Sequence, residues 1–336
     1  MEIIALIAAI IGIITGLWFL WDKFHIKRSN SQSFSYLEGS QKFPVIRRID
    51  FPRTPLLCVN ESLYLNKVSV FLGNNGVGKT AICEWLSGLE GIKYLERWLN
   101  LSKSEPIILK LEIRDPEKHN LSLKLSNSSL TFNFDGNDIP ESPYPFRIIL
   151  ASRKKFSTEG MDDADILAKH LNMDKATLQN YGTRVGSSFY CSISKIQFKD
   201  ENSKTNVYVD MEGTSPNLRF GSLSGSEKGR VILELAVAIA QFLSSTIPVI
   251  LIIERDNFNL DKGSATKYVD WIISSNFKFQ TIIVSCPRNN DVDWSKCEVV
   301  NFDGKPPNVK IQNKNNRMQK KSNQANSTDA KSRAAD

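Results

Sequence analysis

The order of apolar and polar positions divides the chain of 336 residues into three parts. The first, residues 1–28, contains nineteen consecutive residues without a charge, Ile3 to Trp21. The second, residues 29–304, holds short apolar runs separated by polar turns, which is typical of a folded domain of helices and strands. The third, residues 305–336, has too few apolar residues to form a core, and its composition predicts a disordered tail.

The uncharged stretch predicts a transmembrane helix, because nineteen residues at 1.5 Å each nearly span the hydrocarbon core of a bilayer. Lys23, Lys27 and Arg28 follow it, whereas Glu2 alone precedes it. The positive-inside rule then places the rest of the chain in the cytoplasm, held at the cell inner membrane by a single span. A cleaved signal peptide would carry its positive charge before the apolar run, and a buried helix of a soluble protein is the other alternative.

The middle part mixes strand-like and helix-like segments, which predicts an α/β domain. Alternating apolar positions indicate antiparallel strands over 106–115 and 121–134, and a hairpin over 190–213. Residues 146–152 are expected to form a buried strand, and residues 162–182 one or two helices. Since no heptad repeat of coiled-coil length occurs, a long coiled-coil arm is not expected.

The net charge of +7 would suggest a nucleic-acid partner if it lay on the folded domain. Residues 305–336, however, carry eight Lys or Arg and two Asp, so +6 of this charge belongs to the basic tail. The tail is either a solvated end or an arm that contacts anionic lipid or nucleic acid. The five cysteines have no paired spacing and the three histidines form no cluster, which argues against a disulfide framework or a zinc site.

A phosphate-binding loop is the strongest motif of the chain. Residues 68–80 read VSVFLGNNGVGKT, and they lie between an apolar strand and a helix. In this context the loop N–H groups and the helix N-terminus bind phosphate, Lys79 reaches the β- and γ-phosphates, and Thr80 holds Mg²⁺. The sequence therefore predicts ATP and Mg²⁺ as cofactors. The residues expected to bind them are Gly73, Asn74, Asn75, Gly76, Gly78, Lys79 and Thr80.

A second motif precedes the longest helical pattern. Ser224 and Glu227 form a capping box, S-x-x-E, at the start of a helix that is apolar on one face. The same stretch, LSGSE, resembles the signature sequence of ABC-type ATPases, and residues 257–261, NFNLD, resemble their D-loop. The order of the motifs is similar to that in the RecF/SMC branch, especially the compact heads of bacterial anti-phage defence and chromosome-repair proteins. The resemblance covers about residues 45–302.

This resemblance implies a P-loop ABC-type ATPase head, with a mixed sheet, an antiparallel β subdomain and a helical lobe. It implies that two heads, in a homodimer or a heterodimer, enclose ATP between the phosphate loop of one and the signature of the other. The residues that it adds to the nucleotide site are Ser224, Gly225, Ser226 and Asp261.

The acids after the apolar run 249–253 depart from the family pattern. In ABC-type ATPases the carboxylate on the metal side lies seven residues before the D-loop aspartate. Counting back seven residues from Asp261 reaches Glu254, which by this resemblance takes the place of that carboxylate. Arg255 takes the place of the glutamate that orients the attacking water, and a guanidinium has no acceptor with which to do so. Cys286 replaces the histidine that contacts the γ-phosphate. Hydrolysis is therefore expected to be slow or lost, unless Asp256 reaches the water.

Three functions remain open on this basis. The first is a membrane-anchored, nucleotide-gated dimerising switch or sensor in a bacterial defence or DNA-linked complex. The second is a working ATPase that remodels a partner, and the third is a non-catalytic anchored scaffold for a separate effector. No nuclease, protease or Toprim-like motif is found, so cutting activity would require a separate effector protein. One span makes no substrate pathway, which argues against a transporter.

Overall fold

The computed structural model describes residues 43–313 apart from 55–56, 58–60, 153–155, 186–191, 213–215, 259 and 288–291. These residues belong to one compact unit that begins at Lys42. None of the helices in these ranges has the length and hydropathy that a membrane span requires. The predicted span Ile3–Trp21 lies outside the described residues and stays a prediction.

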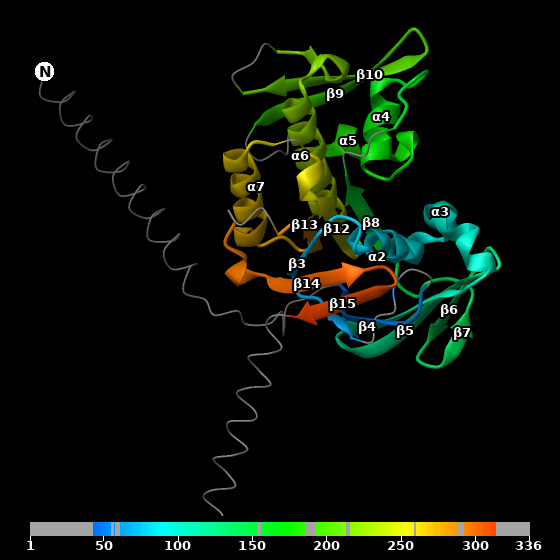
Figure 1. The fold of residues 1–336 in the computed structure, drawn as a ribbon. Helices are drawn as coiled ribbons and strands as arrows, with labels where there is room; N and C mark the ends of the chain where they lie inside the picture. Colours follow the sequence, from blue (N-terminus) through cyan, green and yellow to red (C-terminus); the bar gives the residue numbers. More distant parts are fainter. Residues whose placement is uncertain are drawn as a thin grey trace, which may run out of the picture. The chain divides into compact units, whose positions relative to one another are not determined.

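A six-stranded mixed sheet forms the centre of this unit (Figure 1). Its strand order is β15-β14-β3-β13-β12-β8, and all neighbours are parallel except β15, which is antiparallel to β14. The strands are β3 (Val68–Gly73), β8 (Arg147–Ala151), β12 (Val249–Glu254), β13 (Gln280–Ser285), β14 (Glu298–Lys305) and β15 (Asn308–Asn313).

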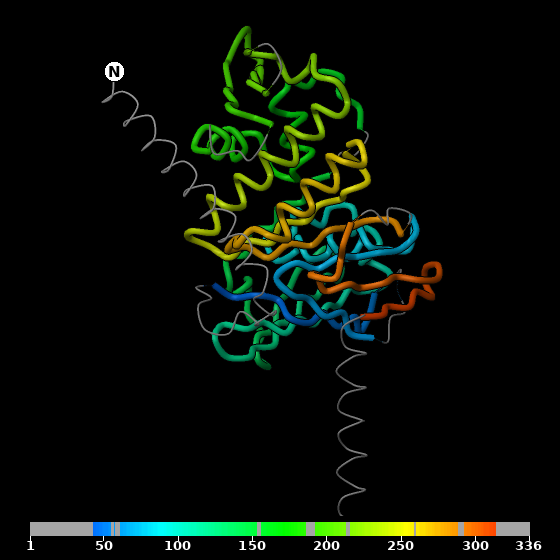
Figure 2. Tube along the Cα trace, turned by 90° about the vertical axis from the view of Figure 1, so that its left-hand side faces the viewer, coloured from blue at the N-terminus to red at the C-terminus, as the bar shows by residue number. Residues whose placement is uncertain are grey.

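Two hydrophobic cores lie on the two faces of the central sheet. Because side chains alternate along a strand, Leu251 and Ile253 of β12 join one core, and Ile250 and Ile252 join the other. Both faces are therefore covered, which explains why β12 is a continuous apolar run with every residue buried. Figures 1 and 2 show the layers, with the helices α6 and α7 above the sheet and an antiparallel sheet below it.

The antiparallel sheet is the predicted β subdomain. Its order is β2-β1-β4-β5-β6-β7, and the predicted strands over 106–115 and 121–134 are confirmed as β4, β5 and β6. The strands are β1 (Val45–Arg53), β2 (Leu63–Tyr64), β4 (Ile107–Asp115), β5 (Glu117–Ser126), β6 (Ser129–Phe134) and β7 (Asn137–Ile139). Between this sheet and the central one lies α2 (Lys79–Leu86), followed by the short α3 (Glu96–Leu99).

The helical lobe covers the opposite face of the central sheet. The segment 162–182 forms two helices, α4 (Asp163–His170) and α5 (Lys175–Val185). The predicted hairpin is present as β9 (Ile193–Glu201) and β10 (Lys204–Met211), to which β11 (Leu218–Arg219) adds a third strand. The helices α6 (Gly225–Leu243) and α7 (Lys262–Ser274) complete the lobe, and α6 begins with the predicted capping box.

The folded unit continues beyond the boundary expected at residue 304. Strand β15 pairs with β14 from Asn308 to Asn313, inside the range predicted to be a disordered tail. Val309 and Ile311 are both buried there, so their alternation forms a half-buried edge strand. The polar composition of the tail as a whole concealed this short pattern. The rest of the predicted tail lies outside the described residues.

Candidate functional site

The phosphate loop connects β3 to α2, as its sequence predicts. The Nζ of Lys79 donates to the carbonyl oxygens of Gly73 and Asn74 at 2.5 and 2.9 Å, so the lysine lies folded against its own loop. Lys79 is only 6% exposed. This burial lowers the pKa of Lys79, although Cys286, Asp256 and other nearby groups oppose the shift. A bound phosphate would favour the charged form of the lysine.

Glu254 lies at the centre of the site, at the end of β12. Its Oε1 accepts a hydrogen bond from the Thr80 hydroxyl at 2.7 Å. Its Oε2 accepts from the Asn257 side-chain amide at 2.9 Å and from the Ser152 hydroxyl. The end of β8, the end of β12 and the end of the phosphate loop therefore meet at one buried carboxylate. Glu254 therefore lies beside Thr80, the other residue predicted to hold Mg²⁺, and its metal-side role stays a prediction.

Thr80 and Glu254 suit Mg²⁺ because both present hard oxygen atoms, side by side at the start of α2. Mg²⁺ is commonly bound by one or two protein groups together with phosphate and water oxygens, so two protein oxygens are sufficient. Bound there with ATP, Mg²⁺ would neutralise phosphate charge. Thr80 and Glu254 would hold it, and Lys79 lies in the same cavity for the phosphates.

Arg255 does not lie where the sequence register placed it. Residues Arg255–Asn257 form a 3-10 turn, in which successive side chains point about 120° apart. The turn brings Asn257 back beside Glu254 and sends Arg255 into an apolar pocket lined by Leu233, Ile253 and Phe258. Arg255 is 7% exposed and does not line the cavity around Lys79, Thr80 and Glu254, which is called the phosphate cavity below. The expectation that Arg255 occupies the water-orienting position is therefore corrected.

Asp256 lies in the phosphate cavity instead. Its Oδ2 accepts the backbone N–H of Cys286 at 2.6 Å, and its Oδ1 accepts the hydroxyl of Ser285 at 3.2 Å. The same hydroxyl receives a hydrogen bond from the Arg255 guanidinium at 3.3 Å. Ser285 thus links Arg255 to Asp256, and Asp256 lines the cavity together with Lys79 and Glu254.

Cys286 lies beside the phosphate loop at the end of β13. Its thiol donates to the Oδ1 of Asn75 at 3.0 Å, so it occupies the same cavity as Lys79 and Asp256. A thiol is a weak hydrogen-bond donor compared with an imidazole N–H, so it offers less support to phosphate than the expected histidine.

The cavity has a volume of about 250 Å³ and includes residues that sequence reasoning missed. Arg97 and Trp98 of α3 line it, as do Val284 and Pro306. The Arg97 guanidinium donates to both carboxylate oxygens of Glu84 at 3.1 Å and is mostly exposed. These residues come from elements far apart in the sequence and belong to no spaced motif, so no local signal could have found them.

The signature residues lie outside this cavity. Ser224 caps α6 and is exposed, while Gly225 and Ser226 form the first turn of the helix. Glu227 returns the capping bond, since its carboxylate accepts the Ser224 N–H at 2.7 Å. None of these residues lines the cavity around Lys79. One chain therefore does not bring its own signature to its own phosphate loop.

The signature is held in place by contacts to both sides. Just before it, Arg219 pairs with the buried Asp163 at the start of α4, with an Nε–Oδ2 distance of 3.0 Å. At Gly229 of α6 a Cβ atom would come within 2.1 Å of the Phe258 carbonyl oxygen, so only glycine allows this close packing. Asp261 caps α7 through Ser264 and lies 3.8 Å from the Arg230 guanidinium. The predicted D-loop is thus joined to the signature helix.

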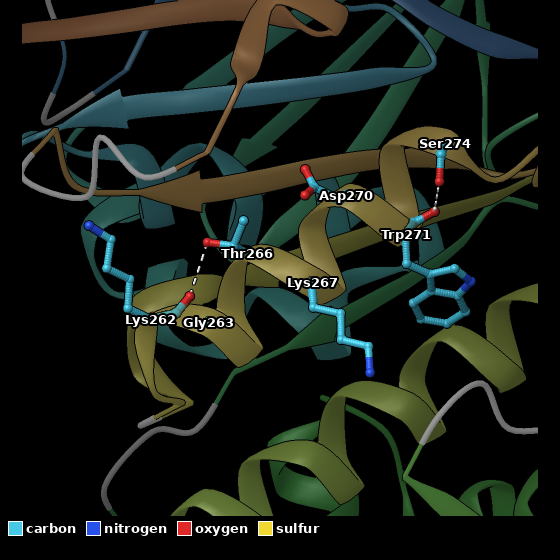
Figure 3. Close-up of a pocket in the computed structure, with 7 residues that line it drawn as sticks. All are labelled: Lys262, Gly263, Thr266, Lys267, Asp270, Trp271 and Ser274. Atoms are coloured by element: carbon cyan, nitrogen blue, oxygen red, sulfur yellow. Dashed lines mark hydrogen bonds between the residues drawn. The ribbon is translucent and has the colours of Figure 1, made fainter. Parts of the chain in front are cut away.

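A larger hollow, of about 680 Å³, lies along the outer face of α7 (Figure 3). Among the residues that the structure describes, those lining it all come from this single helix and none belongs to the predicted site. The Thr266 and Ser274 hydroxyls bond to backbone carbonyls of the helix itself. These two hydroxyls are therefore engaged within the helix.

The fold is similar to that of solved SMC heads. It matches an SMC head bound to the C-winged helix domain of ScpA, with a TM-score of 0.53, 16% identity, and coverage of 80% of this chain and 97% of the other. It also matches the Pyrococcus furiosus SMC head with an extended coiled coil, bound to the C-terminal domain of ScpA (TM-score 0.51, 14% identity, 84% and 99% coverage). A RecF–ATP structure gives a TM-score of 0.48 at 12% identity, covering 83% and 100%.

No protein-family model and no curated protein matches the chain. At these identities the two SMC heads establish a shared fold. The α/β architecture with mixed sheets is therefore shared with these SMC heads.

Proposed function

We propose that this chain is an SMC-type head that binds Mg²⁺ and ATP, dimerises around the nucleotide and hydrolyses it slowly. The observation that carries the proposal is the contact of the Thr80 hydroxyl with the Glu254 carboxylate at 2.7 Å, beside the buried Lys79. It joins the phosphate loop to the strand that ends in the metal-side acid, as a Mg²⁺-nucleotide site requires. The shared fold with SMC heads supports the same conclusion.

Slow hydrolysis is supported by the surroundings of Asp256. Each of its oxygens already accepts a hydrogen bond, from the Cys286 N–H and from Ser285. An attacking water must therefore share an oxygen that is already engaged. Cys286 also supplies a weaker donor than histidine near the terminal phosphate. The presence of Asp256 in the cavity favours an active ATPase as the second candidate function. A slowly hydrolysing head and an active ATPase differ in the rate of phosphate release.

Dimerisation through ATP is supported by the signature, whose Ser224 is exposed and which lies outside the nucleotide cavity of its own chain. The partner is a second copy or a related head. We expect Ser224→Arg to abolish the ATP-dependent dimer while ATP binding by the monomer is retained, because a large side chain at the cap blocks approach of the second nucleotide. Light scattering with and without Mg²⁺ and ATP measures the molecular mass. Ser245→Arg, at the other end of α6, is the matched control.

A mass that doubles with ATP in wild type and in Ser245→Arg, but not in Ser224→Arg, supports the proposal. A dimer formed equally well by the Ser224→Arg variant would remove the signature from the interface.

The anchor at the inner membrane, with the head in the cytoplasm, remains a proposal that is supported by the uncharged stretch and the basic residues after it. A separate effector and a role in a defence or DNA-linked complex rest on the resemblance. That two SMC heads bind domains of ScpA supports a protein partner in general.

We expect the protein to sediment with membranes. A reporter fused after Asp336 is expected to be active only if it is of a type that works in the cytoplasm. The physical reason is the excess of Lys and Arg directly after the apolar stretch. Replacing Lys23, Lys27 and Arg28 by glutamine is the control for this bias. Activity of an exported-only reporter on the unaltered chain would contradict the orientation.

A further inference from the structure

We infer that the turn of the C-terminal hairpin, at Pro306, is the wall against which the nucleoside part of the bound triphosphate rests. The inference deepens the proposed function, and it rests on that function for the presence of a nucleotide. Pro306 lines the same cavity as Asn75, Lys79 and Thr80, although it comes from the far end of the chain.

The sheet order fixes the direction of the nucleotide. Glu254, Asp256 and Cys286, the acids and the thiol expected near the terminal phosphate, lie at the ends of β12 and β13. Both strands lie on one side of β3, which leads into the phosphate loop, and β14 lies on the other. We expect a triphosphate held by the loop with its terminal phosphate toward β12 and β13 to extend its nucleoside to the other side of β3, toward β14. The turn that follows β14 contains Pro306.

Pro306 is held at a fixed place relative to the phosphate loop. Phe302 of β14 lies opposite Gly73, the last residue of β3. A Cβ atom on Gly73 would come within 2.7 Å of the Phe302 carbonyl oxygen, so the two strands meet as closely as glycine permits. Lys305 pairs with Asn308 across the turn, which leaves Pro306 and Pro307 at its tip. The wall is therefore rigidly connected to the loop that binds phosphate.

The chemistry of proline suits contact with a base or a ribose rather than with phosphate. Pro306 has no N–H to offer an anion, and its ring is apolar and conformationally fixed. Its contribution is apolar contact area, so its loss is expected to weaken binding of the nucleoside part and leave the phosphate contacts intact. Partial removal of one such contact corresponds to about a fivefold change in affinity.

The experiment compares ATP with inorganic tripolyphosphate, which has the phosphate chain and no nucleoside. Dissociation constants are measured with Mg²⁺ for the full chain, for Pro306→Gly, for the milder Pro306→Ala and for Asn308→Ala. We expect Pro306→Gly to weaken ATP binding about fivefold, Pro306→Ala to weaken it less, and neither to change tripolyphosphate binding. Asn308→Ala, across the same turn and outside the cavity, should match wild type for both ligands.

An unchanged ATP affinity in both Pro306 variants would overturn the inference, and so would an equal loss for ATP and tripolyphosphate, which would show that the turn supports the phosphate loop instead. Wild type that binds tripolyphosphate as tightly as ATP would also overturn it, while leaving the phosphate site in place. Wild type that binds neither ligand would instead refute the proposed function on which the inference rests. Thermal unfolding of each variant shows whether the turn has kept its fold.

Discussion

Replacing Lys79 by alanine is expected to abolish binding of ATP at concentrations that saturate the wild type. Lys79 is the buried cation of the phosphate loop. Its Nζ donates hydrogen bonds to the carbonyl oxygens of Gly73 and Asn74, and it can exchange these bonds for bonds to a phosphate. A hydrogen bond to a charged group contributes about 1.5–3 kcal/mol, and Lys79 can make several to the β- and γ-phosphates. The affinity is therefore expected to fall about a hundredfold or more.

Lys67→Ala is the matched control for this variant. Lys67 lies just before the other end of β3, where its Nζ donates to Asn276 at 2.8 Å, far along the strand from the phosphate loop. The Lys67→Ala substitution removes one positive charge from the same part of the chain, so a general electrostatic effect would appear in both variants. Isothermal titration with ATP and Mg²⁺ measures both. Equal affinities for wild type and Lys79→Ala would show that residues 73–80 are a structural turn.

The parts of the site that local patterns encode were predictable from the sequence. The phosphate loop needs a strand, glycines and a helix start in succession, and β3 and α2 supply them. The capping box of Ser224 and Glu227 is formed by residues three apart, so its hydrogen bonds follow from the local sequence. The apolar run 249–253 forms most of strand β12, and every residue of the strand is buried.

The direction of the side chains after β12 was not predictable from spacing. Counting residues along the chain placed Arg255 at the water, because the count assumes the same backbone path as in the family. The backbone instead enters a 3-10 turn at Arg255, and this turn decides which side chain faces the cavity. The apolar pocket that receives Arg255 is formed by residues of α6, α7, β12 and β13, which only the tertiary fold brings together. Only tertiary packing could settle the choice between Arg255 and Asp256.

Contacts between distant elements escaped prediction for the same reason. Pro306 and Arg97 reach one cavity from opposite parts of the chain, and neither belongs to a motif with fixed spacing. The edge strand β15 was hidden by the polar composition of the residues after it. Its two buried residues, Val309 and Ile311, are too few to outweigh a basic, asparagine-rich tail in a compositional argument.

Asp256→Asn is expected to reduce ATP hydrolysis by about a hundredfold relative to wild type while ATP binding is retained, since positioned acid–base groups contribute about 10²–10⁴-fold. The amide keeps the shape of the side chain and one acceptor oxygen, but it cannot take a proton from water. The site of Lys79, Thr80 and Glu254 is left intact, so ATP-dependent dimerisation should persist. Phosphate release under saturating ATP measures the rate, and light scattering measures the dimer.

Arg255→Met is the informative comparison, because it removes the guanidinium and keeps an apolar side chain that fills the pocket of Leu233 and Phe258. Because Arg255 does not line the cavity around Lys79, hydrolysis should change several-fold at most. Arg255→Glu, which the linear register suggested as a rescue, would instead place a carboxylate in that apolar pocket, and we expect it to lower the unfolding temperature rather than to speed turnover. Cys286→His tests the other altered position, where an imidazole N–H beside Asn75 should raise the rate.

The hydrolysis rates of the four variants, compared with wild type, identify the acid that orients the attacking water. Hydrolysis that is lost in Asp256→Asn and kept in Arg255→Met assigns the water to Asp256, whatever the absolute speed of the wild type. Hydrolysis that rises in a stably folded Arg255→Glu variant would mean that this side chain leaves its pocket and reaches the phosphate when ATP binds. Hydrolysis unaffected by Asp256→Asn would exclude Asp256 as the acceptor, and would leave Glu254 or a residue of the partner head for this role.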